Sequence, residues 1–509
     1  MSKPFKKFIK LIENKRVVIW GLGLNRGGLG ATLFFAKSKA RVIVVDQKPE
    51  KDLKKSIEVL RRFSNVKFVF GNQDEKNFKN ADLIIKNQAI PWEHPLVKKL
   101  LNRGVAIETD ITLFFRFFKG EIVGVTGSKG KTTTTILIGK FLSKSGKEVL
   151  LGGNIRVSLF DFFSSKILND KNKVAVLELS SFQLEDLNFI RRSPHVVVIT
   201  NIYRDHLNRY GTLKKYIEAK KPICMFQKGR DFLVLNREDK KAGEFKNCSI
   251  AKAGWFSSKY FAIPALAFQK DKGAGTHVSG EPKHTGSPAK PENHNSKLRI
   301  SVKNPVLLSK NNQANLSAAL AVAGGIFRIK RSVLEKVINN FKGVPYRMEK
   351  IAVIKNVTFY NDTAATIPDA AIGGINSFNG LNPMVGSCPS RRAGSPEEDN
   401  KRKKTILISG GADKNLKFAK FAKTIAKKIK RVILLPGTAT PLIVSALKKY
   451  APRVPRREVK SMDSAVKTAY KEAAPGDTIL LSPGCASFGL FKNEFDRGDQ
   501  FNVAVRKLK

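Results

Sequence analysis

The chain has 509 residues, of which 42% are hydrophobic, and it carries 93 Lys and Arg against 42 Asp and Glu, a formal net charge of +51. This length predicts roughly three domains. No apolar run approaches the ~20 residues that cross a bilayer. The four cysteines show no paired spacing, which argues against a disulfide framework and a zinc site.

The large positive charge would suit a nucleic-acid partner. The lysines are dispersed along the chain, however, and no nucleic-acid-binding module is recognisable. We therefore expect no nucleic-acid partner and no membrane insertion. Residues 1–16 are basic with single apolar residues and no small-residue cleavage site, so we expect a short helix there rather than a signal peptide. The cysteine usage fits a cytoplasmic location.

The first block of the chain, residues 1–119, opens with a βαβ pattern. An apolar strand runs into a glycine-rich turn, and a helix and a second apolar strand follow. This order is typical of a doubly wound, Rossmann-like sheet. The predicted strands are 16–23, 41–46, 66–71 and 81–87.

The second block, residues 120–342, and the third, residues 343–509, repeat the same alternation of short apolar strands and helices. Such alternation predicts parallel sheets whose sites lie at the carboxyl ends of the strands. Two stretches, 268–297 and 385–404, are rich in Gly, Pro, Ser and charge, and we expect them to be insertions. The predicted strands are 121–126, 174–180, 195–201 and 231–236 in the second block, and 357–362, 405–411, 431–437 and 478–484 in the third.

A glycine-rich turn, TGSKGKT at 126–132, follows the first strand of the second block and opens a helix. Such a turn lets backbone N–H groups and the helix N-terminus approach phosphate oxygens. Lys131 would reach the β- and γ-phosphates, and the Thr132 hydroxyl would ligate Mg²⁺. Val125 stands where the strict motif requires glycine, so this is a shortened variant of the phosphate loop.

Glu178 ends the apolar strand VAVLE, where a carboxylate is costly unless it is paired or bound to metal. Placed opposite Thr132, it would ligate the same Mg²⁺. The alternative is a glutamate at the strand end that faces solvent.

TGSKGKTTT, together with LELSSFQLE (177–185) and the segment 200–220, resembles the consecutive motifs of the Mur ligase family in order and spacing. The resemblance implies an ATP-dependent amide ligase that works through an acyl phosphate with ATP and two Mg²⁺ ions. It implies that His206 is a metal-site histidine and that Lys220 is carbamylated and ligates the second Mg²⁺. Lys131, Glu178, His206, Lys220 and Arg347 would be catalytic, and Thr132, Glu178, His206 and Lys220 would hold metal.

Further family motifs extend the ATP site. The segment 307–323 resembles the helix whose asparagines face adenine, GVPYRMEK (343–350) resembles the linker into the third domain, and 359–370 matches the next motif. The resemblance assigns ATP contacts to Thr126, Gly127, Ser128, Lys129, Gly130, Lys131, Thr132, Thr133, Asn312, Asn315, Arg347 and Asp362.

Two segments near the C-terminus resemble those of the D-glutamate-adding members of the family. ISGGADKN (408–415) places Lys414 where a carboxylate would pair with it, and 481–501 resembles the ending of those enzymes. For Phe488, core packing is nearly as good an interpretation as pocket lining. The implied amino-acid site comprises Thr366, Lys414, Ser487 and Phe488.

The first glycine loop, residues 21–27, is not G-x-G-x-x-G because Arg26 occupies the third glycine's place. Set before a Mur-type phosphate loop, this block resembles the domain that binds the UDP-linked substrate. Asp46, at the end of the second strand, would bond a ribose. The implied UDP-substrate contacts are Leu24, Asn25, Asp46, Asn87, Ala89 and Asn154.

The sequence thus predicts an α/β protein of three domains: 1–119, Rossmann-like and UDP-substrate-binding; 120–342, a central P-loop-type ATPase; and 343–509, Rossmann-like and amino-acid-binding. The resemblance implies a monomer that joins D-glutamate to UDP-N-acetylmuramoyl-L-alanine. Three alternatives stay open: a sibling or folylpolyglutamate-type ligase, an NAD-dependent enzyme that uses the first glycine loop, and a nucleic-acid-binding NTPase.

Overall fold

The computed structural model describes residues 3–23, 27–71, 73–155, 157–258, 300, 302, 304–308, 310–377 and 403–508. These residues form two compact units, the first from Met1–Ile202, Ile217–Ser301 and Ala314–Val337, the second from Tyr203–Tyr216, Val302–Gln313 and Ile338–Lys509. The expected insertions, 268–297 and nearly all of 385–404, lie outside the described residues. The domain boundaries at 119 and 342 stay a prediction.

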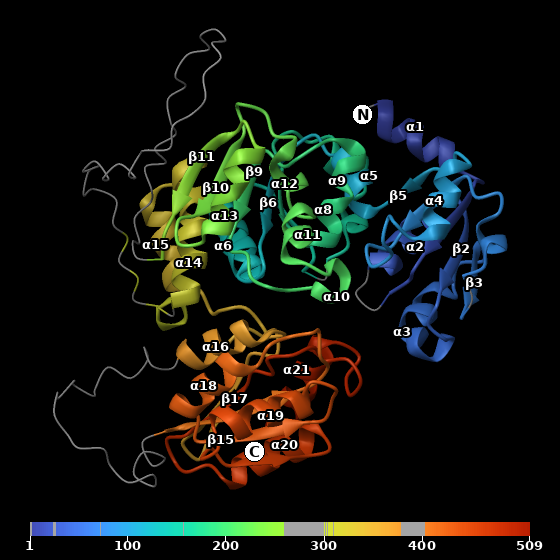
Figure 1. Ribbon diagram of the computed structural model, residues 1–509. Coiled ribbons are helices and arrows are strands. Elements are labelled where there is room, and N and C mark those ends of the chain that lie inside the picture. The colour runs from blue at the N-terminus through green and yellow to red at the C-terminus, as the bar shows by residue number, and fades with distance from the viewer. Residues whose placement is uncertain are drawn as a thin grey trace, which may run out of the picture. The chain divides into compact units, whose positions relative to one another are not determined.

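The first unit begins with a five-stranded parallel sheet of order β3-β2-β1-β4-β5, as the βαβ pattern predicts (Figure 1). The chain places β2 and β3 on one side of β1 and then β4 and β5 on the other. The carboxyl ends of β1, β2 and β4 therefore lie at a topological switch point. The strands are β1 Arg16–Trp20, β2 Arg41–Asp46, β3 Val66–Phe70, β4 Leu83–Lys86 and β5 Ile107–Glu108, and the helices are α1 Lys3–Ile12, α2 Gly27–Lys37, α3 Glu50–Leu60, η1 Glu75–Phe78, α4 Pro95–Asn102 and α5 Asp110–Phe117.

The second sheet of this unit has six parallel strands in the order β11-β10-β9-β6-β8-β7. The segment after β6 therefore emerges between β8 and β9, which is again a switch point. The strands are β6 Glu121–Thr126, β7 Val149–Gly153, β8 Val174–Glu178, β9 Val196–Ile199, β10 Phe232–Asn236 and β11 Lys252–Phe256.

The helices between residues 131 and 339 are mostly short. They are α6 Lys131–Lys144, η2 Leu159–Phe162, α7 Ser165–Leu168, α8 Ser181–Glu185, α9 Leu187–Ile190, α10 Leu207–Tyr210, α11 Leu213–Glu218, α12 Pro222–Met225, α13 Lys240–Gly243, η3 Glu244–Cys248, η5 Pro305–Leu307, α14 Lys310–Leu320, the π-helical turn η6 Ala321–Ile326 and α15 Arg331–Asn339. Of these, α10, η5 and parts of α11, α14 and α15 cluster with the second unit.

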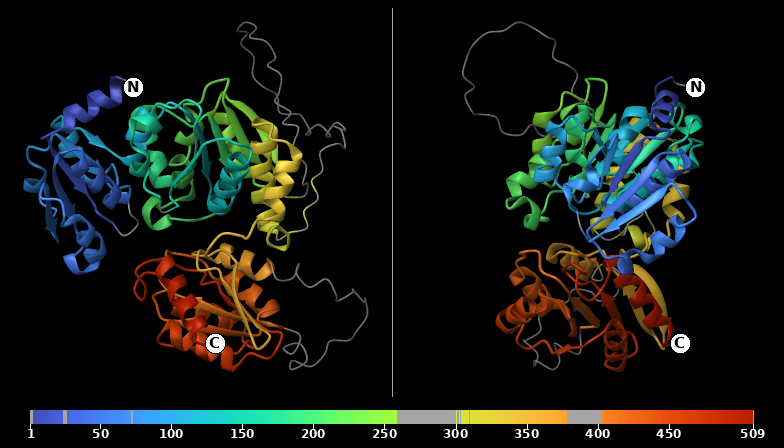
Figure 2. Two further views of the ribbon diagram at one scale, coloured as in Figure 1. Left: turned by 180° about the vertical axis from the view of Figure 1, so that it is seen from behind. Right: turned by 90° about the vertical axis from the view of Figure 1, so that its right-hand side faces the viewer.

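The second unit is built on a six-stranded sheet of order β12-β13-β17-β14-β15-β16, parallel except for the antiparallel edge pair β12–β13. Strand residues alternate between two cores, so α16, α18 and α19 pack on one face and α20 and α21 on the other (Figure 2). The elements are β12 Glu349–Ile354, β13 Val357–Asn361, α16 Pro368–Ser377, β14 Thr405–Gly410, α18 Ala419–Lys428, β15 Arg431–Leu435, α19 Thr440–Tyr450, β16 Arg456–Glu458, α20 Met462–Lys471, β17 Thr478–Leu481 and α21 Glu494–Arg506.

The expected α/β class with parallel sheets is confirmed, and α1 confirms the expected helix at the beginning of the sequence. The apolar face of α1 packs through Phe5 on Phe117 and Phe163, with ring centroids 5.3 and 6.1 Å apart. Within the described residues, no helix combines the length and hydropathy that crossing a membrane requires.

Candidate nucleotide-binding site

The turn after β6 has a backbone that only glycine adopts readily at two positions. Gly127 has φ +142° and Gly130 has φ +83°, both in the region that L side chains rarely adopt. A Cβ at Gly127 would lie 2.0 Å from the Thr200 hydroxyl, and one at Gly130 would lie 2.1 Å from the Asn315 side-chain oxygen. The glycines of TGSKGKT therefore allow the turn to pack against β9 and α14.

The turn is held by the residues that follow β9. The amide N–H of Lys129 donates to Asn201 Oδ1 at 2.8 Å, and Asn201 Nδ2 donates back to the Lys129 carbonyl at 3.0 Å. Thr200 Oγ1 donates to the same carbonyl at 2.6 Å. Asn201 has no assigned role in the sequence-based prediction, although it follows an apolar strand and precedes the candidate His206.

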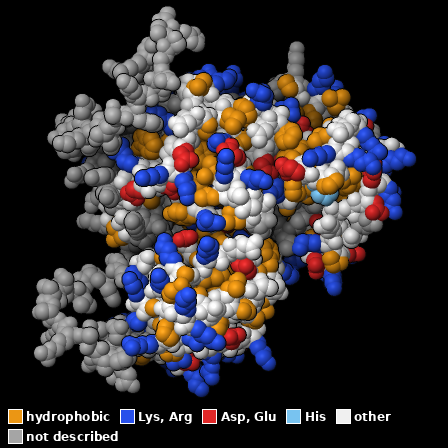
Figure 3. Space-filling model, viewed as in Figure 1, with side chains coloured by type: hydrophobic (Ala, Val, Ile, Leu, Met, Phe, Trp, Pro, Cys, Tyr) orange, Lys and Arg blue, Asp and Glu red, His pale blue; other side chains and the backbone are white. Residues whose placement is uncertain are grey.

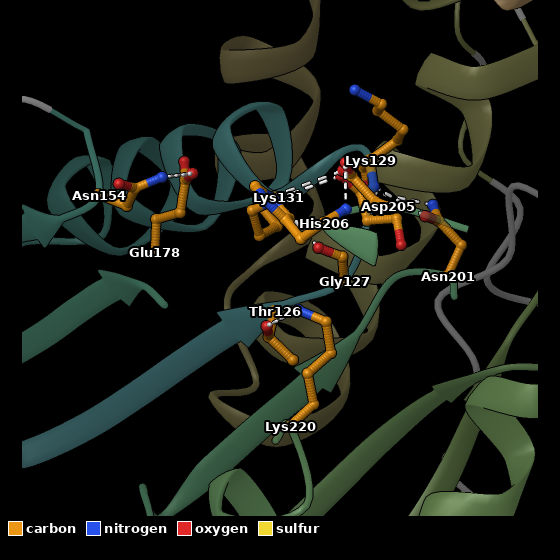
Figure 4. Close-up of polar contacts among 11 residues, drawn as sticks. Thr126, Gly127, Lys129, Lys131, Asn154, Glu178, Asn201, Asp205, His206 and Lys220 are labelled. Carbon is orange, nitrogen blue, oxygen red and sulfur yellow. Dashed lines mark hydrogen bonds and ion pairs between the residues drawn. The ribbon is translucent and has the colours of Figure 1, made fainter. Parts of the chain in front are cut away.

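Lys131, the first residue of α6, folds back over the turn. Its Nζ donates to the carbonyls of Gly127 at 2.9 Å and Ser128 at 3.2 Å (Figure 4). The ammonium thus lies at the mouth of the turn and at the positive end of α6, where an anion is favoured. The Thr133 side chain, next along α6, is buried.

Thr132 and Glu178 meet as predicted. Thr132 Oγ1 donates to Glu178 Oε2 at 2.5 Å. Asn154 Nδ2 donates to Glu178 Oε1 at 3.2 Å (Figure 4). The Glu178 side chain is only 2% exposed, so the alternative of a solvent-facing glutamate is wrong. A buried carboxylate beside a hydroxyl supplies the oxygen ligands that Mg²⁺ prefers.

Lys220 lies below the turn and is 1% exposed. Its Nζ donates to Thr126 Oγ1 at 3.3 Å (Figure 4). That hydroxyl donates to the Leu179 carbonyl at 2.7 Å. In the sequence, Lys220 looks like a surface lysine at a helix end. The structure buries it under the carboxyl end of β6, which is a site where an ammonium needs polar partners.

His206 immediately precedes α10 and has φ +52°, an unusual backbone for a residue with a side chain. Its N–H donates to Asp205 Oδ1 at 2.9 Å, and its Nε2 lies 3.8 Å from Asp205 Oδ2. This segment clusters with the second unit and Glu178 with the first, so the joint metal role of His206 and Glu178 stays a prediction. Across the described parts of the chain, no three His, Cys, Asp or Glu side chains group as a metal site by themselves.

The switch point of the first sheet gathers the predicted uridine residues that the structure describes. Asp46 Oδ2 accepts the Gly23 N–H at 3.1 Å. Asn87 Nδ2 donates to the Gly21 carbonyl at 3.3 Å, and its Oδ1 accepts the Ala89 N–H at 3.0 Å. Both side chains therefore shape the glycine loop, whose residues Leu24 and Asn25 lie outside the described part of the chain.

The second unit holds the predicted linker and the following motif. Arg347, half-buried, lies between Tyr346 and Met348, which both have positive φ. Asp362 Oδ2 accepts the Ser482 hydroxyl at 2.8 Å, and its Oδ1 accepts the Met348 N–H at 3.3 Å. Asp362 thus fixes the backbone beside Arg347. Thr366 is half-buried just before α16, and Asn312 Nδ2 donates to the Val306 carbonyl at 2.7 Å.

The two segments that resemble D-glutamate-adding enzymes lie side by side. Ala412 and Ala486 exchange backbone hydrogen bonds of 2.9 and 3.1 Å. This pairing brings the segment of Lys414 next to that of Ser487 and Phe488. Ser487 is buried, whereas Phe488 is 61% exposed, so the core-packing interpretation of Phe488 is wrong.

Arg497 of α21 was missed by the sequence-based prediction, although it lies in the segment 481–501. It is 0% exposed, and its guanidinium donates to Thr363 Oγ1, the Thr363 carbonyl and the carbonyls of Cys485 and Ala486 at 2.9–3.3 Å. Burial lowers the pKa of Arg497 to about 10. This side chain fixes the backbone immediately before Ser487.

The three largely parallel sheets and the glycine-rich turn after β6 define an α/β protein with a phosphate-type turn. Residues 125–323 match the Mur ligase middle domain, and residues 15–109 match the MurD-like N-terminal domain of Mur ligases. Similar curated proteins include the UDP-N-acetylmuramoylalanine–D-glutamate ligases of Roseiflexus sp. (strain RS-1), 35% identical over 98% of this chain and 99% of the relative, and of Acetivibrio thermocellus, 32% identical over 100% of both. The chain belongs to the Mur ligase family.

Solved structures support the same fold. UDP-N-acetylmuramate-alanine ligase MurC from Thermotoga maritima matches with a TM-score of 0.60 at 19% identity, over 97% of this chain and 100% of that structure. A pseudomurein peptide ligase type C from Methanothermus fervidus matches with a TM-score of 0.53 at 21% identity, over 97% and 100%.

Proposed function

We propose that this chain is an ATP-dependent amide ligase that joins D-glutamate to UDP-N-acetylmuramoyl-L-alanine in the synthesis of peptidoglycan precursors. The observation that carries the proposal is the contact between Thr132 and Glu178 at the open end of a phosphate-type turn. The curated relatives from Roseiflexus sp. and Acetivibrio thermocellus, which match along nearly the whole chain, are ligases of this specificity.

In the proposed reaction, the free carboxylate of the L-alanyl group attacks the γ-phosphorus of ATP. An acyl phosphate and ADP result, and the amine of D-glutamate then displaces phosphate to form the amide. Lys131 and Arg347 would hold the phosphates while negative charge develops on the transferring group, and such stabilisation is usually the largest catalytic term. Asn312 and Asn315 would contact adenine, and Asp362 would support the nucleotide.

Mg²⁺ fits the residues present at the end of the turn. Thr132 and Glu178 offer oxygen ligands, and Mg²⁺ is usually held by one or two carboxylates with the remaining positions given to phosphates and water. When bound, Mg²⁺ neutralises phosphate charge and orients the triphosphate. A second ion would draw on His206 and a carbamylated Lys220.

The UDP-linked acid and D-glutamate would each bind at a separate group of residues. Leu24, Asn25, Asp46, Asn87, Ala89 and Asn154 would bind the UDP-linked acid. Thr366, Lys414, Ser487 and Phe488 would bind D-glutamate, with the Lys414 ammonium on a carboxylate. We propose a cytoplasmic monomer with the domains 1–119, 120–342 and 343–509.

The exchange Lys131→Ala tests the phosphate-loop assignment. It should lower kcat for ADP release by about 100-fold or more, because a charge that contacts the reacting phosphate is lost. Lys140→Ala is a matched control, since Lys140 is an exposed lysine on the same helix. Turnover close to that of the unmodified protein in Lys131→Ala would refute the assignment, provided that both variants unfold at the same temperature.

A further inference from the structure

Two cysteines that are distant in the sequence lie against each other. Cys224 in α12 and Cys248 at the end of η3 are 24 residues apart, and their Sγ atoms are 3.0 Å apart. Cys248 Sγ also donates to the Phe245 carbonyl at 3.1 Å. Both are free thiols, and the irregular spacing of the cysteines in the sequence does not predict that these two lie together.

The two segments are held together by contacts other than the thiols. Ser249 Oγ donates to Gln227 Oε1 at 3.0 Å, which ties the residue after η3 to the segment after α12. Gln227 Nε2 in turn donates to the carbonyls of Pro194 and Phe232 at 3.2 and 3.0 Å. These hydrogen bonds tie the segment of Cys224 to β10 and to the residues before β9, so contacts other than the thiols bring the two sulfurs together.

The two thiols differ in access and in acidity. Cys224 is fully buried, whereas Cys248 is partly exposed. The hydrogen bond from the Cys224 thiol lowers the pKa of Cys248, as does the nearby charge of Lys221. The same hydrogen bond and burial raise the pKa of Cys224. Since the thiolate is the nucleophile, Cys248 is the group that an oxidant in solution meets first.

We propose that Cys224 and Cys248 are a redox modification site that forms a reversible intramolecular disulfide with a low-molecular-weight disulfide as oxidant. The Cys248 thiolate attacks one sulfur of the oxidant, forms a mixed disulfide and releases one thiolate. Cys224 then loses its proton and attacks Cys248 Sγ, which releases the second thiolate. Two protein thiols are oxidised, and one small disulfide is reduced to two thiols.

Closing this link needs little movement. The S–S bond is ~2.05 Å long, so the sulfurs approach each other by about 1 Å. The link would anchor the segment just after Lys220, because Ile223 N–H donates to the Lys220 carbonyl at 3.2 Å and Cys224 N–H to that of Lys221 at 3.0 Å. In a reducing compartment such a bond would be transient, formed under oxidative stress and reopened by thiols.

The test uses the full chain incubated with oxidised glutathione, then alkylated and mapped by mass spectrometry without reduction. We expect a peptide that joins Cys224 to Cys248, its loss on addition of dithiothreitol, and an unfolding midpoint several degrees above that of the reduced protein. Cys485→Ser, which alters a buried cysteine elsewhere, should leave all three results unchanged.

Two variants separate the roles of the thiols. Cys224→Ser should accumulate the glutathione mixed disulfide at Cys248, since the resolving thiol is missing, while Cys248→Ser should gain no glutathione at Cys224. If the oxidised wild-type chain keeps both thiols free, or joins either of them to Cys388 or Cys485, the proposal is overturned.

Discussion

At the scale of single residues, the environment of Lys220 bears most directly on the chemistry. Its amine is 1% exposed and 3.3 Å from the Thr126 hydroxyl, at the base of the phosphate-type turn. An ammonium there would repel a nearby Mg²⁺. A carbamate, formed from the neutral amine and CO₂ with loss of a proton, would instead offer an oxygen ligand.

Lys220→Ala should therefore inactivate ligation, and short carboxylates such as formate or acetate added to the assay should restore part of the activity. Lys221→Ala is the matched control, because Lys221 is partly exposed and pairs with Glu218 at 2.7 Å. Full activity of Lys220→Ala would contradict the proposal that Lys220 acts as a carbamate. So would a failure of the added carboxylates to restore any of the lost activity.

Site residues could be predicted from the sequence where they lie at the end of a predicted strand or at the beginning of a predicted helix. Glu178 is the last residue of β8, and Thr132 lies in the first turn of α6, which follows the neighbouring parallel strand β6, so the topology brings the two together. The burial of Lys220 and the neighbouring thiols of Cys224 and Cys248 could not be predicted in this way, because they depend on how short helices pack beneath the sheet.

At the scale of elements, the junction between α8 and α9 buries an unusual acid. Asp186 accepts hydrogen bonds from Trp92 Nε1 at 2.8 Å and Thr109 Oγ1 at 2.9 Å, and so joins the first sheet's helices and loops to the central sheet. Burial raises the pKa of Asp186 to about 7 from an ordinary value of 3.8, although Lys86 and the two hydrogen bonds oppose the shift.

Because the folded chain binds this proton more tightly than the unfolded chain, the contribution to stability is fully present below pH ~4. It is lost as pH rises from about 4 to about 7. The amide of Asp186→Asn does not titrate, so this variant should not lose stability between pH ~4 and ~7. Its unfolding midpoint should therefore rise relative to that of the wild type as the pH increases over this range. Denaturant unfolding at several pH values measures it, with exposed Asp161→Asn as control. Parallel pH profiles would contradict the assignment.

In helix α21, the buried side chain of Arg497 donates hydrogen bonds to three backbone carbonyls. Arg497→Met removes the side-chain donor from the carbonyls of Thr363, Cys485 and Ala486, of which Ala486 keeps the hydrogen bond from the Ala412 N–H. We expect a loss of about 2–4 kcal/mol in the free energy of unfolding of the second unit and a raised KM for D-glutamate. Arg506→Met, an exposed position on the same helix, should change neither. Unchanged stability in Arg497→Met would show that these hydrogen bonds are dispensable.

The continuous apolar strands β1, β6, β8, β9, β14, β15 and β17 were all predicted, because strands buried on both faces read as unbroken Val, Ile and Leu. Five strands were missed: β5, β7, β11, β12 and β16. Val149–Gly153 contains two glycines and reads as a turn, and Lys252–Phe256 begins with a charged residue and holds a central glycine. β7 and β11 form strands because they pair with β8 and β10, which their own sequences do not indicate.

At the scale of the whole molecule, the net charge of +51 invites a nucleic-acid function. On the face drawn in Figure 3, Lys and Arg side chains are spread over both units and interspersed with Asp and Glu. A dispersed positive surface raises the local concentration of anionic small molecules. ATP and a UDP-linked acid, both anionic, fit such a surface without a polymer partner.

The most direct test is a coupled assay of ADP release with UDP-N-acetylmuramoyl-L-alanine, ATP, Mg²⁺ and either D- or L-glutamate. We predict turnover that requires the UDP-linked acid and D-glutamate, with only background release for L-glutamate. No ADP release with D-glutamate, or equal release with another amino acid or with no UDP-linked acid, would contradict the proposed function.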